Sequence, residues 1–505
     1  MILLQQSSQE YNNDLRAMIM AFFPGVKIVE KQEEGQEYQF TFKAEYSTDE
    51  TVLGICDFGN GEDCDCDVVI CNSDEDITAQ GNNCGKSGIN IIRIAGDYRD
   101  KQVFRNKLKM ASYRLLTAKA GRLLPWGDLT GVRPTKIAMS QLKEGKSLSD
   151  AVQNYVDVYA VSERKAALAA KVAEKELGLT SDIDLDNDYC LYIGIPFCPS
   201  RCLYCSFTSY PIALYQDKAE KYIDKLNEEL AFVAERYKDR NLVAIYVGGG
   251  TPTAISHELL DKMLGQVENV FDLTKLREFT VEAGRPDSIT ADKLRVLRKH
   301  GVTRISINPQ TMNDETLKTI GRAHTAAQAK EAFAMARQEG FDNINMDLIS
   351  GLPGENLDSM RHTLEEVKAL SPESITVHSL AIKRAANLKQ QMSEYGDMIN
   401  QDMNEMLDMV SDAAMELDME PYYLYRQKNI GGNLENVGYS KDGLECLYNI
   451  LIMEEMTDIV AVGAGASTKL TYHSENRVER VENCKSVDVY IERFDEMISR
   501  KKKFF

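Results

Sequence analysis

The sequence predicts an α/β protein whose core is a partial (β/α)6 barrel, with an N-terminal α+β domain before it and a small C-terminal α+β domain after it. From residue 189 to about residue 382, apolar strand-like runs alternate with helical runs, which is typical of a parallel sheet with crossover helices. The chain has 505 residues, which is too long for one ordinary core. This alternation of strands and helices does not continue before residue 189 or after about residue 382. We therefore expect three domains, at residues 1–182, 183–382 and 383–505.

The N-terminal domain begins with a predicted helix at residues 13–23, where apolar positions have helical spacing and Pro24-Gly25 follow. Residues 26–30 and 38–46 are expected to form a hairpin. A stretch that is rich in Asp, Glu, Gly and Asn comes next, and it contains five cysteines: Cys56, Cys64, Cys66, Cys71 and Cys84. Their spacing matches no metal-ligand pattern, so a poorly ordered loop is favoured over a second metal site.

Helical periodicity returns at residues 98–121, and further helices are expected at 134–144, 147–156 and 162–176. Between the first two lies LPWGDLTGVRPTK, residues 124–136, which contains the only Trp of the chain. Its Gly and Pro residues indicate an ordered loop that either docks this domain on the barrel or contacts substrate, and docking is the favoured interpretation.

The barrel strands are expected at residues 190–195, 242–247, 278–283, 303–308, 343–349 and 374–379. Helices are expected between them, for example at 217–237 and 325–338. In such a barrel, functional residues lie at the carboxyl ends of the strands. In the C-terminal domain we expect helices at 400–416 and 487–500, and a strand at 458–463.

Composition excludes some classes of function. The net charge is -19 and the pI is near 5.0, which argues against nucleic acid or an anionic membrane as a partner. No stretch has the length of a transmembrane helix, and the N-terminus lacks the order of a signal peptide. We therefore expect a cytoplasmic protein with no membrane span, in which the eleven cysteines are reduced.

The main chemical motif is a group of three cysteines directly after the first barrel strand. Cys198, Cys202 and Cys205 are spaced C-x3-C-x2-C, which suits a metal or a cluster better than a packed core. A structural zinc site needs four ligands, and the other nearby thiol, Cys190, lies before the strand. Three thiolates can hold a [4Fe-4S] cluster and leave one iron open for another ligand. A cluster is therefore the prediction.

This motif resembles the signature of the radical S-adenosylmethionine (SAM) enzymes. The resemblance implies that the open iron binds the amino and carboxylate groups of SAM. The motif GGGTPT, residues 248–253, follows the second strand, and its glycines let the backbone approach a ligand closely. It matches the radical SAM segment that holds the amino group of SAM. Glu282 ends the third strand and can accept hydrogen bonds from ribose hydroxyls. Arg322 can hold a carboxylate.

The order of YIGIPFC, GGGTPT, PQTMNDETLKTIGRAHT and DLISGLPGE resembles the oxygen-independent coproporphyrinogen III oxidases, over roughly residues 189–470. Enzymes of that family bind two SAM molecules beside the cluster. Carried over by motif, the cluster-bound SAM is expected to contact Tyr192, Gly249 and Glu282. The second SAM is expected to contact Tyr204, Gly250, Thr251, Gln310, Arg322, Asp347 and Ala381. Beyond the cluster and SAM, no catalytic side chain is predicted.

Differences within the family indicate the branch. The oxidase has a fourth cysteine where this chain has Phe207. The haem chaperone branch carries a His-Asn-x-x-Tyr-Trp segment, and the nearest match here, residues 435–440, lacks both the His and the Trp. The long N-terminal domain that ends in LTGVRPTK, residues 129–136, resembles the HemZ-type branch, the oxygen-independent coproporphyrinogen III dehydrogenases.

The resemblance implies an oxidoreductase of porphyrin and haem biosynthesis. It would convert two propionates of coproporphyrinogen III to vinyl groups, giving protoporphyrinogen IX, with electrons from an unidentified donor. The tetrapyrrole is a tetra-anion, and Lys383, Arg384 and Arg426 are candidates to contact it, although simple surface solvation explains them equally well. The first alternative is a haem-binding chaperone without porphyrinogen turnover. The second is a radical SAM enzyme with an unrelated substrate.

Overall fold

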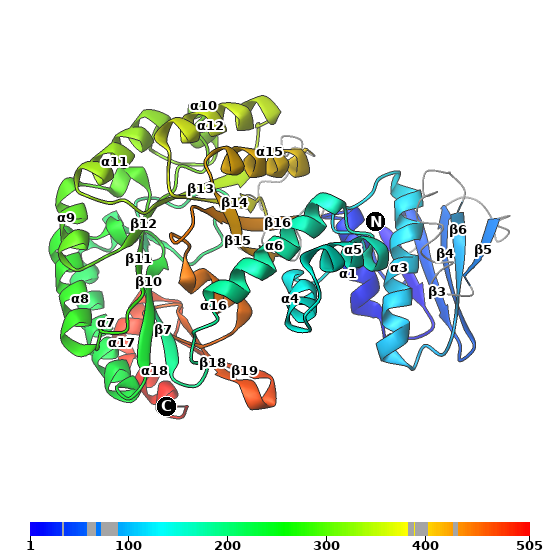
Figure 1. The fold of residues 1–505 in the computed structure, drawn as a ribbon, viewed down its shortest axis with the longest axis horizontal. Helices are drawn as coiled ribbons and strands as arrows, with labels where there is room; N and C mark the ends of the chain where they lie inside the picture. The colour runs from blue at the N-terminus through cyan, green and yellow to red at the C-terminus, as the bar shows by residue number, and fades with distance from the viewer. Residues whose placement is uncertain are drawn as a thin grey trace. The chain divides into compact units, whose positions relative to one another are not determined.

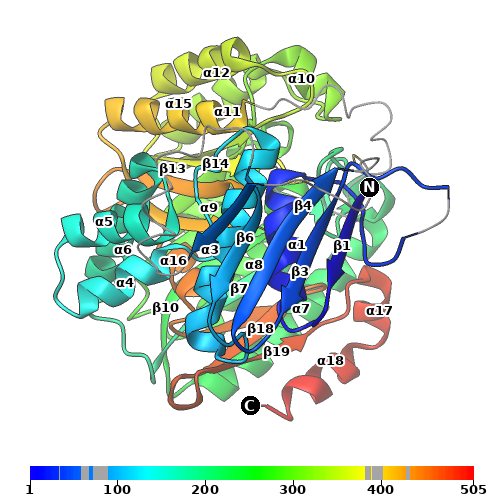
Figure 2. The ribbon, with the colours of Figure 1, turned by 90° about the vertical axis from the view of Figure 1, so that its right-hand side faces the viewer.

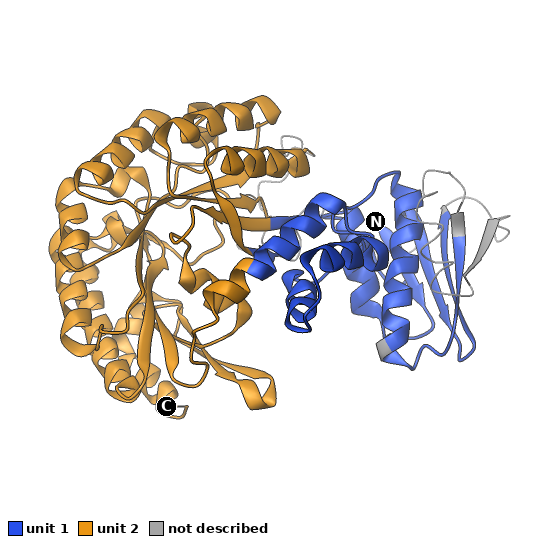
Figure 3. Ribbon diagram, viewed as in Figure 1, with its two compact units in different colours: residues 1–174, 424–435 blue, residues 175–423, 436–505 orange. Residues whose placement is uncertain are grey.

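The computed structural model describes residues 1–32, 35–57, 67–71, 89–381, 388, 402–427 and 433–504. The chain divides into two compact units (Figure 3). Unit 1 comprises residues 1–174 and 424–435, and unit 2 comprises residues 175–423 and 436–505. The division into three domains with boundaries at 182 and 382 stays a prediction.

Unit 1 contains a six-stranded sheet in the order β2-β1-β3-β4-β6-β5. The strands are β1 (Ile2–Gln6), β2 (Ile28–Val29), β3 (Phe40–Tyr46), β4 (Glu50–Asp57), β5 (Asp67–Cys71) and β6 (Ile89–Ala95). Helices α1 (Asn12–Phe22) and α3 (Lys101–Ala120) lie against one face of this sheet (Figure 2). That face is apolar because alternate residues such as Phe40, Phe42 and Ala44 point toward the helices and are buried.

The predicted hairpin of residues 26–30 and 38–46 is wrong. Strand β1 lies between β2 and β3 and is parallel to both. The apolar run Ile2–Leu4 is almost fully buried, and β1 therefore lies between the two segments that were expected to pair with each other. The loop prediction for the cysteine-rich stretch is wrong at Cys56, which lies in β4, and at Cys71, which ends β5. Cys64, Cys66 and Cys84 lie outside the described residues, so the prediction stays untested there.

The predicted helices of unit 1 are confirmed as α4 (Thr135–Lys143), α5 (Leu148–Tyr159) and α6 (Glu163–Leu179), the last of which continues into unit 2. The loop before α4 is ordered around Trp126, whose side chain is fully buried. Its indole Nε1 donates to Glu435 Oε2 at 2.6 Å, and Lys165 Nζ lies 2.8 Å from Glu435 Oε1. These three residues belong to unit 1, so docking of the loop on the barrel stays a prediction.

Unit 2 is built on the larger sheet, whose eleven strands have the order β15-β16-β14-β13-β12-β11-β10-β7-β17-β18-β19. The six predicted barrel strands are β7 (Asp188–Ile195), β10 (Asn241–Gly249), β11 (Glu278–Gly284), β12 (Arg304–Ile307), β13 (Ile344–Ser350) and β14 (Ser374–Ser379). Each is parallel to its neighbour in this series. The partial (β/α)6 barrel is therefore confirmed.

Helices cover the outer, convex side of this curved sheet (Figure 1). They are α7 (Gln216–Tyr237), α8 (His257–Val270), α9 (Ala291–Lys299), α11 (Ala326–Gln338) and α12 (Leu357–Leu370), with the short α10 (Asp314–Thr319) before α11. Side chains of Ser256, Thr290, Thr325 and Asn356 cap the N-termini of α8, α9, α11 and α12 by accepting a backbone N–H, which explains where these helices begin.

The C-terminal segments extend the same sheet at both ends. Strand β16 (Glu435–Ser440) pairs antiparallel with β14, and β17 (Asp458–Val462) pairs parallel with β7. The remaining elements are α15 (Met403–Glu416), β15 (Glu420–Arg426), α16 (Leu447–Glu454), β18 (Ser467–Tyr472), β19 (Arg477–Glu482), α17 (Val487–Glu492) and α18 (Phe494–Lys501). Across the described ranges, none of the helices combines the length and the apolar character needed to cross a membrane.

Candidate cluster and SAM site

The three cysteines lie on the segment that leaves β7. After Pro196, the short strand β8 (Phe197–Cys198) pairs with β9 (Tyr210–Pro211), and this pairing closes the loop that carries Cys202 and Cys205. Cys205 N donates to Cys202 O at 3.2 Å, which turns the chain between the second and third thiol. All three cysteines are free thiols, and burial raises the pKa values of Cys198 and Cys205. Thiols in this environment need a nearby cation to become thiolates.

The donor set consists of three cysteine sulfurs on one loop, and such soft ligands suit an iron–sulfur cluster. Within the described ranges, no three His, Cys, Asp or Glu side chains converge so as to hold one metal ion. A four-iron cluster does not need such convergence, because each thiolate binds a different iron. Cys202 is buried, while Cys198 and Cys205 are partly exposed. The three sulfur ligands therefore fit the predicted cluster.

The glycine loop after β10 lies directly against the cysteine loop. Gly250 N donates to Ile195 O and Thr251 N donates to Phe197 O, both at 2.7 Å. A Cβ at Gly250 would lie 2.5 Å from Phe197 O, so only glycine fits there. Gly249 has a φ of +105°, and a Cβ there would lie 3.2 Å from Tyr192 Oη. Two predicted site residues, Gly249 and Gly250, are thus held beside the thiols by close backbone packing.

Thr251 contacts a predicted cluster ligand. Its side chain is buried, and its Oγ1 lies 3.6 Å from Cys198 Sγ. The resemblance assigned Thr251 to the second SAM. The hydroxyl lies where it can donate to the sulfur of Cys198, which is a contact of the kind that tunes clusters, and the assignment to the second SAM stays a prediction.

Glu282 lies on the inner face of the barrel beside a group of stacked tyrosines. Tyr246 Oη donates to Glu282 Oε1 at 2.7 Å. The Tyr246 ring stacks on Tyr448 with a centroid distance of 4.6 Å, and Tyr192 lies parallel to both at 6.3 Å. Burial raises the pKa of Glu282 to about 7, against the opposing effect of the Tyr246 hydrogen bond. Near neutral pH this carboxyl can therefore either accept or donate a hydrogen bond.

Four residues predicted for the second SAM form two contacting pairs. Gln310 has a φ of +71°, which is unusual for a residue other than glycine. Its backbone is fixed by Gln310 N donating to Asp347 O and by Ile349 N donating to Gln310 O, both at 3.0 Å. Arg322 is buried and donates through Nη2 to Tyr204 Oη at 3.1 Å. The structure therefore pairs Gln310 with Asp347 and Arg322 with Tyr204.

Asp347 is held as a carboxylate. Burial raises its pKa, but the nearby His378 and the hydrogen bond from Asn345 outweigh burial, and the pKa lies below its usual value. Asn345 Nδ2 donates to Asp347 Oδ1 at 2.7 Å, and His378 Nε2 lies 3.7 Å from Asp347 Oδ2. Ala381 lies two residues after the end of β14, the strand that carries His378.

Sequence reasoning missed several residues of this region. Tyr246 and His378 are inward-facing positions of predicted strands, and their strand register could have identified them. Tyr448 comes from α16, where no local motif marks it. Arg426 was a candidate for substrate binding, but it is buried in unit 1, where Nη1 donates to Leu129 O and Nε donates to Asn433 O, both at 2.9 Å. The other two candidates, Lys383 and Arg384, lie outside the described residues.

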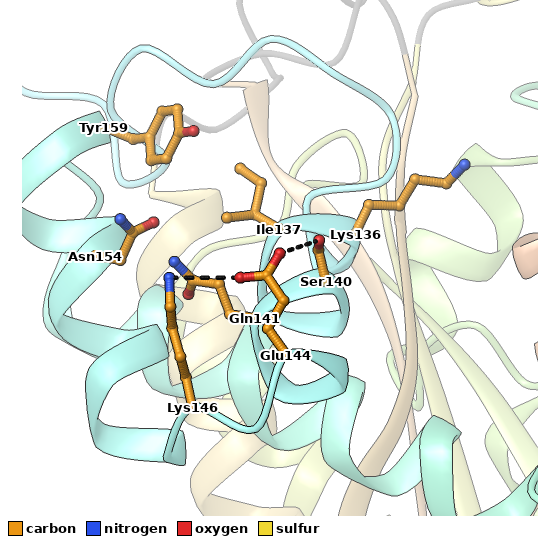
Figure 4. Close-up of a pocket in the computed structure, with 8 residues that line it drawn as sticks. All are labelled: Lys136, Ile137, Ser140, Gln141, Glu144, Lys146, Asn154 and Tyr159. Atoms are coloured by element: carbon orange, nitrogen blue, oxygen red, sulfur yellow. Dashed lines mark hydrogen bonds and ion pairs between the residues drawn. The ribbon is translucent and has the colours of Figure 1, made fainter.

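A separate hollow of about 430 Å³ lies in unit 1 (Figure 4). Its lining residues are Lys136, Ile137, Ser140, Gln141, Glu144, Lys146, Asn154 and Tyr159. Lys146 Nζ lies 3.7 Å from Glu144 Oε2, so part of its charge is already compensated within the hollow. None of the predicted cluster or SAM residues is among the lining residues.

Comparison with known proteins agrees with this geometry. The radical SAM superfamily pattern matches residues 192–367. The oxygen-independent coproporphyrinogen-III oxidase-like protein HemZ of Bacillus subtilis is 39% identical over 447 residues, which cover 86% of this chain and 89% of HemZ. The haem chaperone HemW of B. subtilis is 37% identical over 193 residues, 38% of this chain and 50% of HemW. The match to HemZ therefore covers 86% of this chain, whereas the match to B. subtilis HemW covers only 38% of it.

The solved structure of coproporphyrinogen III oxidase (HemN) from Escherichia coli has a TM-score of 0.50 and 22% identity, and covers 63% of this chain and 72% of HemN. This likeness supports the fold. The barrel and its cysteine loop define a radical SAM protein. Within that superfamily, the chain belongs to the family of HemZ, the oxygen-independent coproporphyrinogen-III oxidase-like proteins.

Proposed function

We propose that this protein is a radical SAM oxidoreductase that oxidatively decarboxylates propionates of coproporphyrinogen III to vinyl groups, giving protoporphyrinogen IX. The observation that carries the proposal is the pair of 2.7 Å backbone hydrogen bonds that fix the glycine loop against the cysteine loop. In this arrangement Gly249 lies beside Tyr192, another residue expected to contact the cluster-bound SAM. The substrate class is chosen by analogy with the relative HemZ, an oxygen-independent coproporphyrinogen-III oxidase-like protein.

In this proposal Cys198, Cys202 and Cys205 hold the cluster, and Tyr192, Gly249 and Glu282 bind the SAM at its open iron. When bound, the cluster supplies one electron to SAM, and SAM supplies the radical that removes a hydrogen atom from the propionate. The propionate radical would then release CO2 and pass one electron to an external one-electron acceptor, which leaves the vinyl group. Beyond the cluster and SAM, the chain's own residues bind and orient the reactants and exclude water.

Glu282 has the chemistry to hold ribose hydroxyls, because Tyr246 fixes one of its oxygens and leaves the other available. The second SAM would lie between the Arg322–Tyr204 pair and the Gln310–Asp347 pair, with Gly250, Thr251 and Ala381 completing the site. Arg322 supplies a guanidinium for the SAM carboxylate, and Asp347 supplies a negative charge. The free thiols suit a reducing compartment, and we place the protein in the cytoplasm on that ground.

The test is a coupled assay. Anaerobically reconstituted protein is incubated with a reductant, SAM and coproporphyrinogen III, and 5′-deoxyadenosine and protoporphyrinogen are quantified together. We expect both products, with 5′-deoxyadenosine rising in step with the porphyrin product. SAM cleavage in the absence of porphyrin product would show that coproporphyrinogen III is not the substrate, although the protein would still be a radical SAM enzyme.

A second candidate is a haem chaperone, because the HemW proteins match part of the chain at up to 37% identity. That function predicts stoichiometric haem binding without porphyrinogen conversion. A haem titration monitored by absorbance, run beside the coupled assay, separates the two functions. Haem binding together with an absence of both products would favour the chaperone.

A further inference from the structure

Arg285 contacts the cysteine loop, although it is not among the predicted cluster or SAM residues. It follows β11 directly, and its side chain is only 3% exposed. Its Nη1 donates to Ser200 O at 3.1 Å and to Ser200 Oγ at 2.7 Å, and the same nitrogen lies 3.8 Å from Cys202 Sγ. A buried cation is thereby held beside one of the three predicted cluster ligands.

Asp287 holds the opposite side of the same guanidinium. Arg285 Nε donates to Asp287 Oδ1 at 2.9 Å, and Nη2 donates to Asp287 Oδ2 at 2.7 Å. This two-point contact fixes the plane of the guanidinium. Burial raises the pKa of Asp287, but the Arg285 hydrogen bonds outweigh burial and leave that pKa below its usual value. The order from the loop outward is therefore thiol, guanidinium and carboxylate.

Such an order has a predictable electrostatic effect. Reduction adds one negative charge to a cluster, and a fixed positive charge nearby stabilises the reduced form. A carboxylate behind the cation weakens that stabilisation. Because the Asp287 side chain is 17% exposed, solvent screens it more than it screens Arg285. The cation, which is closer and more buried, should dominate.

We propose that Arg285 and Asp287 form a positioning pair that sets the reduction potential of the cluster on Cys198, Cys202 and Cys205, with Arg285 raising the potential and Asp287 moderating it. This inference rests on the proposed function only in requiring that these cysteines hold a cluster. It is independent of the tetrapyrrole substrate. The pair would thereby set how readily a one-electron donor reduces the cluster before SAM is cleaved.

The rival explanation is that Arg285 only braces the loop through Ser200. The two explanations predict different effects on the reduction potential of the cluster. A brace predicts that loss of either partner impairs the cluster in the same way. A potential-setting pair predicts opposite shifts for loss of the cation and loss of the carboxylate.

The experiment is a redox titration of the anaerobically reconstituted, SAM-free protein, followed by electron paramagnetic resonance (EPR), together with iron content. For Arg285→Gln we expect the reduction equilibrium constant to fall by roughly tenfold, a one-electron shift of about 59 mV to more negative potential. For Asp287→Asn we expect a shift of a few-fold in the opposite direction. Arg285→Lys keeps the positive charge, so its reduction potential should be the closest to that of wild type among these variants. Arg295→Gln, on the exposed face of α9, is the matched control and should leave the potential unchanged.

The inference would be overturned if iron-loaded Arg285→Gln and Asp287→Asn keep the wild-type reduction potential, or if both variants shift it in the same direction. If Arg285→Gln fails to load iron, Asp287→Asn decides the question, since an upward shift supports the pair and an unchanged potential refutes it. A wild-type protein that takes up no iron would instead refute the proposed cluster site. The failures of the two proposals are therefore distinguishable.

Discussion

Replacement of Gly250 by alanine should separate the glycine loop from the cysteine loop. The new Cβ would lie 2.5 Å from Phe197 O and 2.9 Å from Ile195 O, and both atoms belong to the backbone. The same two carbonyls accept the 2.7 Å hydrogen bonds from Thr251 N and Gly250 N. Since backbone atoms cannot rotate out of the way as a side chain can, the two loops must move apart and both hydrogen bonds must lengthen.

The expected cost follows from these contacts. Overpacking of a tight site costs about 1–3 kcal/mol. Two weakened backbone hydrogen bonds add about 1 kcal/mol each. Gly250→Ala should therefore lower the free energy of unfolding by about 3–5 kcal/mol and reduce the iron bound per chain after anaerobic reconstitution. Both are measurable, the first by denaturant unfolding followed by circular dichroism and the second by iron analysis.

Gly178→Ala is the matched control. Gly178 lies in α6, and a Cβ there meets nothing within 4 Å, so alanine should stabilise the helix by roughly 0.5–1 kcal/mol and leave iron binding unchanged. If Gly250→Ala unfolds like the wild type and binds the same amount of iron, the close packing of the two loops does not matter, and the reasoning fails.

Two further predictions concern buried carboxyls. The pKa of Glu282, about 7, lies above the ordinary value of 4.5, so the folded protein binds an extra proton between these pH values and wild-type stability falls as pH rises through this window. Glu282→Gln retains an acceptor for Tyr246 but cannot titrate, so its free energy of unfolding does not fall in this way. The difference in free energy of unfolding between this variant and wild type should therefore shift in favour of the variant by about 3 kcal/mol from pH 4 to pH 8. A difference that does not vary with pH would contradict the raised pKa. In unit 1, Glu435→Ala removes the carboxylate bound by Lys165 and Trp126 and should cost about 3–5 kcal/mol in denaturant unfolding. Glu496→Ala, which breaks an exposed pair with Arg493, should cost less than about 1 kcal/mol, and equal losses in the two variants would refute the argument.

Much of unit 2 could be predicted from the sequence because its signals are local. The six barrel strands appear as apolar runs between helices, and the cysteine and glycine loops follow the first two. Gly249 and Gly250 were identified because close backbone approach requires glycine, and the packing distances agree with that reason. Their assignment also needed the resemblance of GGGTPT to the radical SAM segment, because three glycines alone could form a plain turn.

The remainder depends on contacts between distant segments. Strand β1 was missed because its place between β2 and β3 is decided by sheet pairing and leaves no local motif. Tyr448 joins Tyr192 and Tyr246 only because the C-terminal part of the chain returns to the barrel. Arg426 was a candidate to contact the substrate or to be solvated at the surface, but the fold buries it against backbone carbonyls.

The most direct test of the central claim, that the cysteine loop holds the cluster that binds and cleaves SAM, is anaerobic reconstitution with parallel measurement of iron and of 5′-deoxyadenosine formed from SAM. We predict that wild type and Cys484→Ala, whose thiol lies outside the loop, bind about four iron atoms per chain and cleave SAM. Cys198→Ala should lose the intact cluster and SAM cleavage. Full iron content and undiminished cleavage in Cys198→Ala would contradict the account.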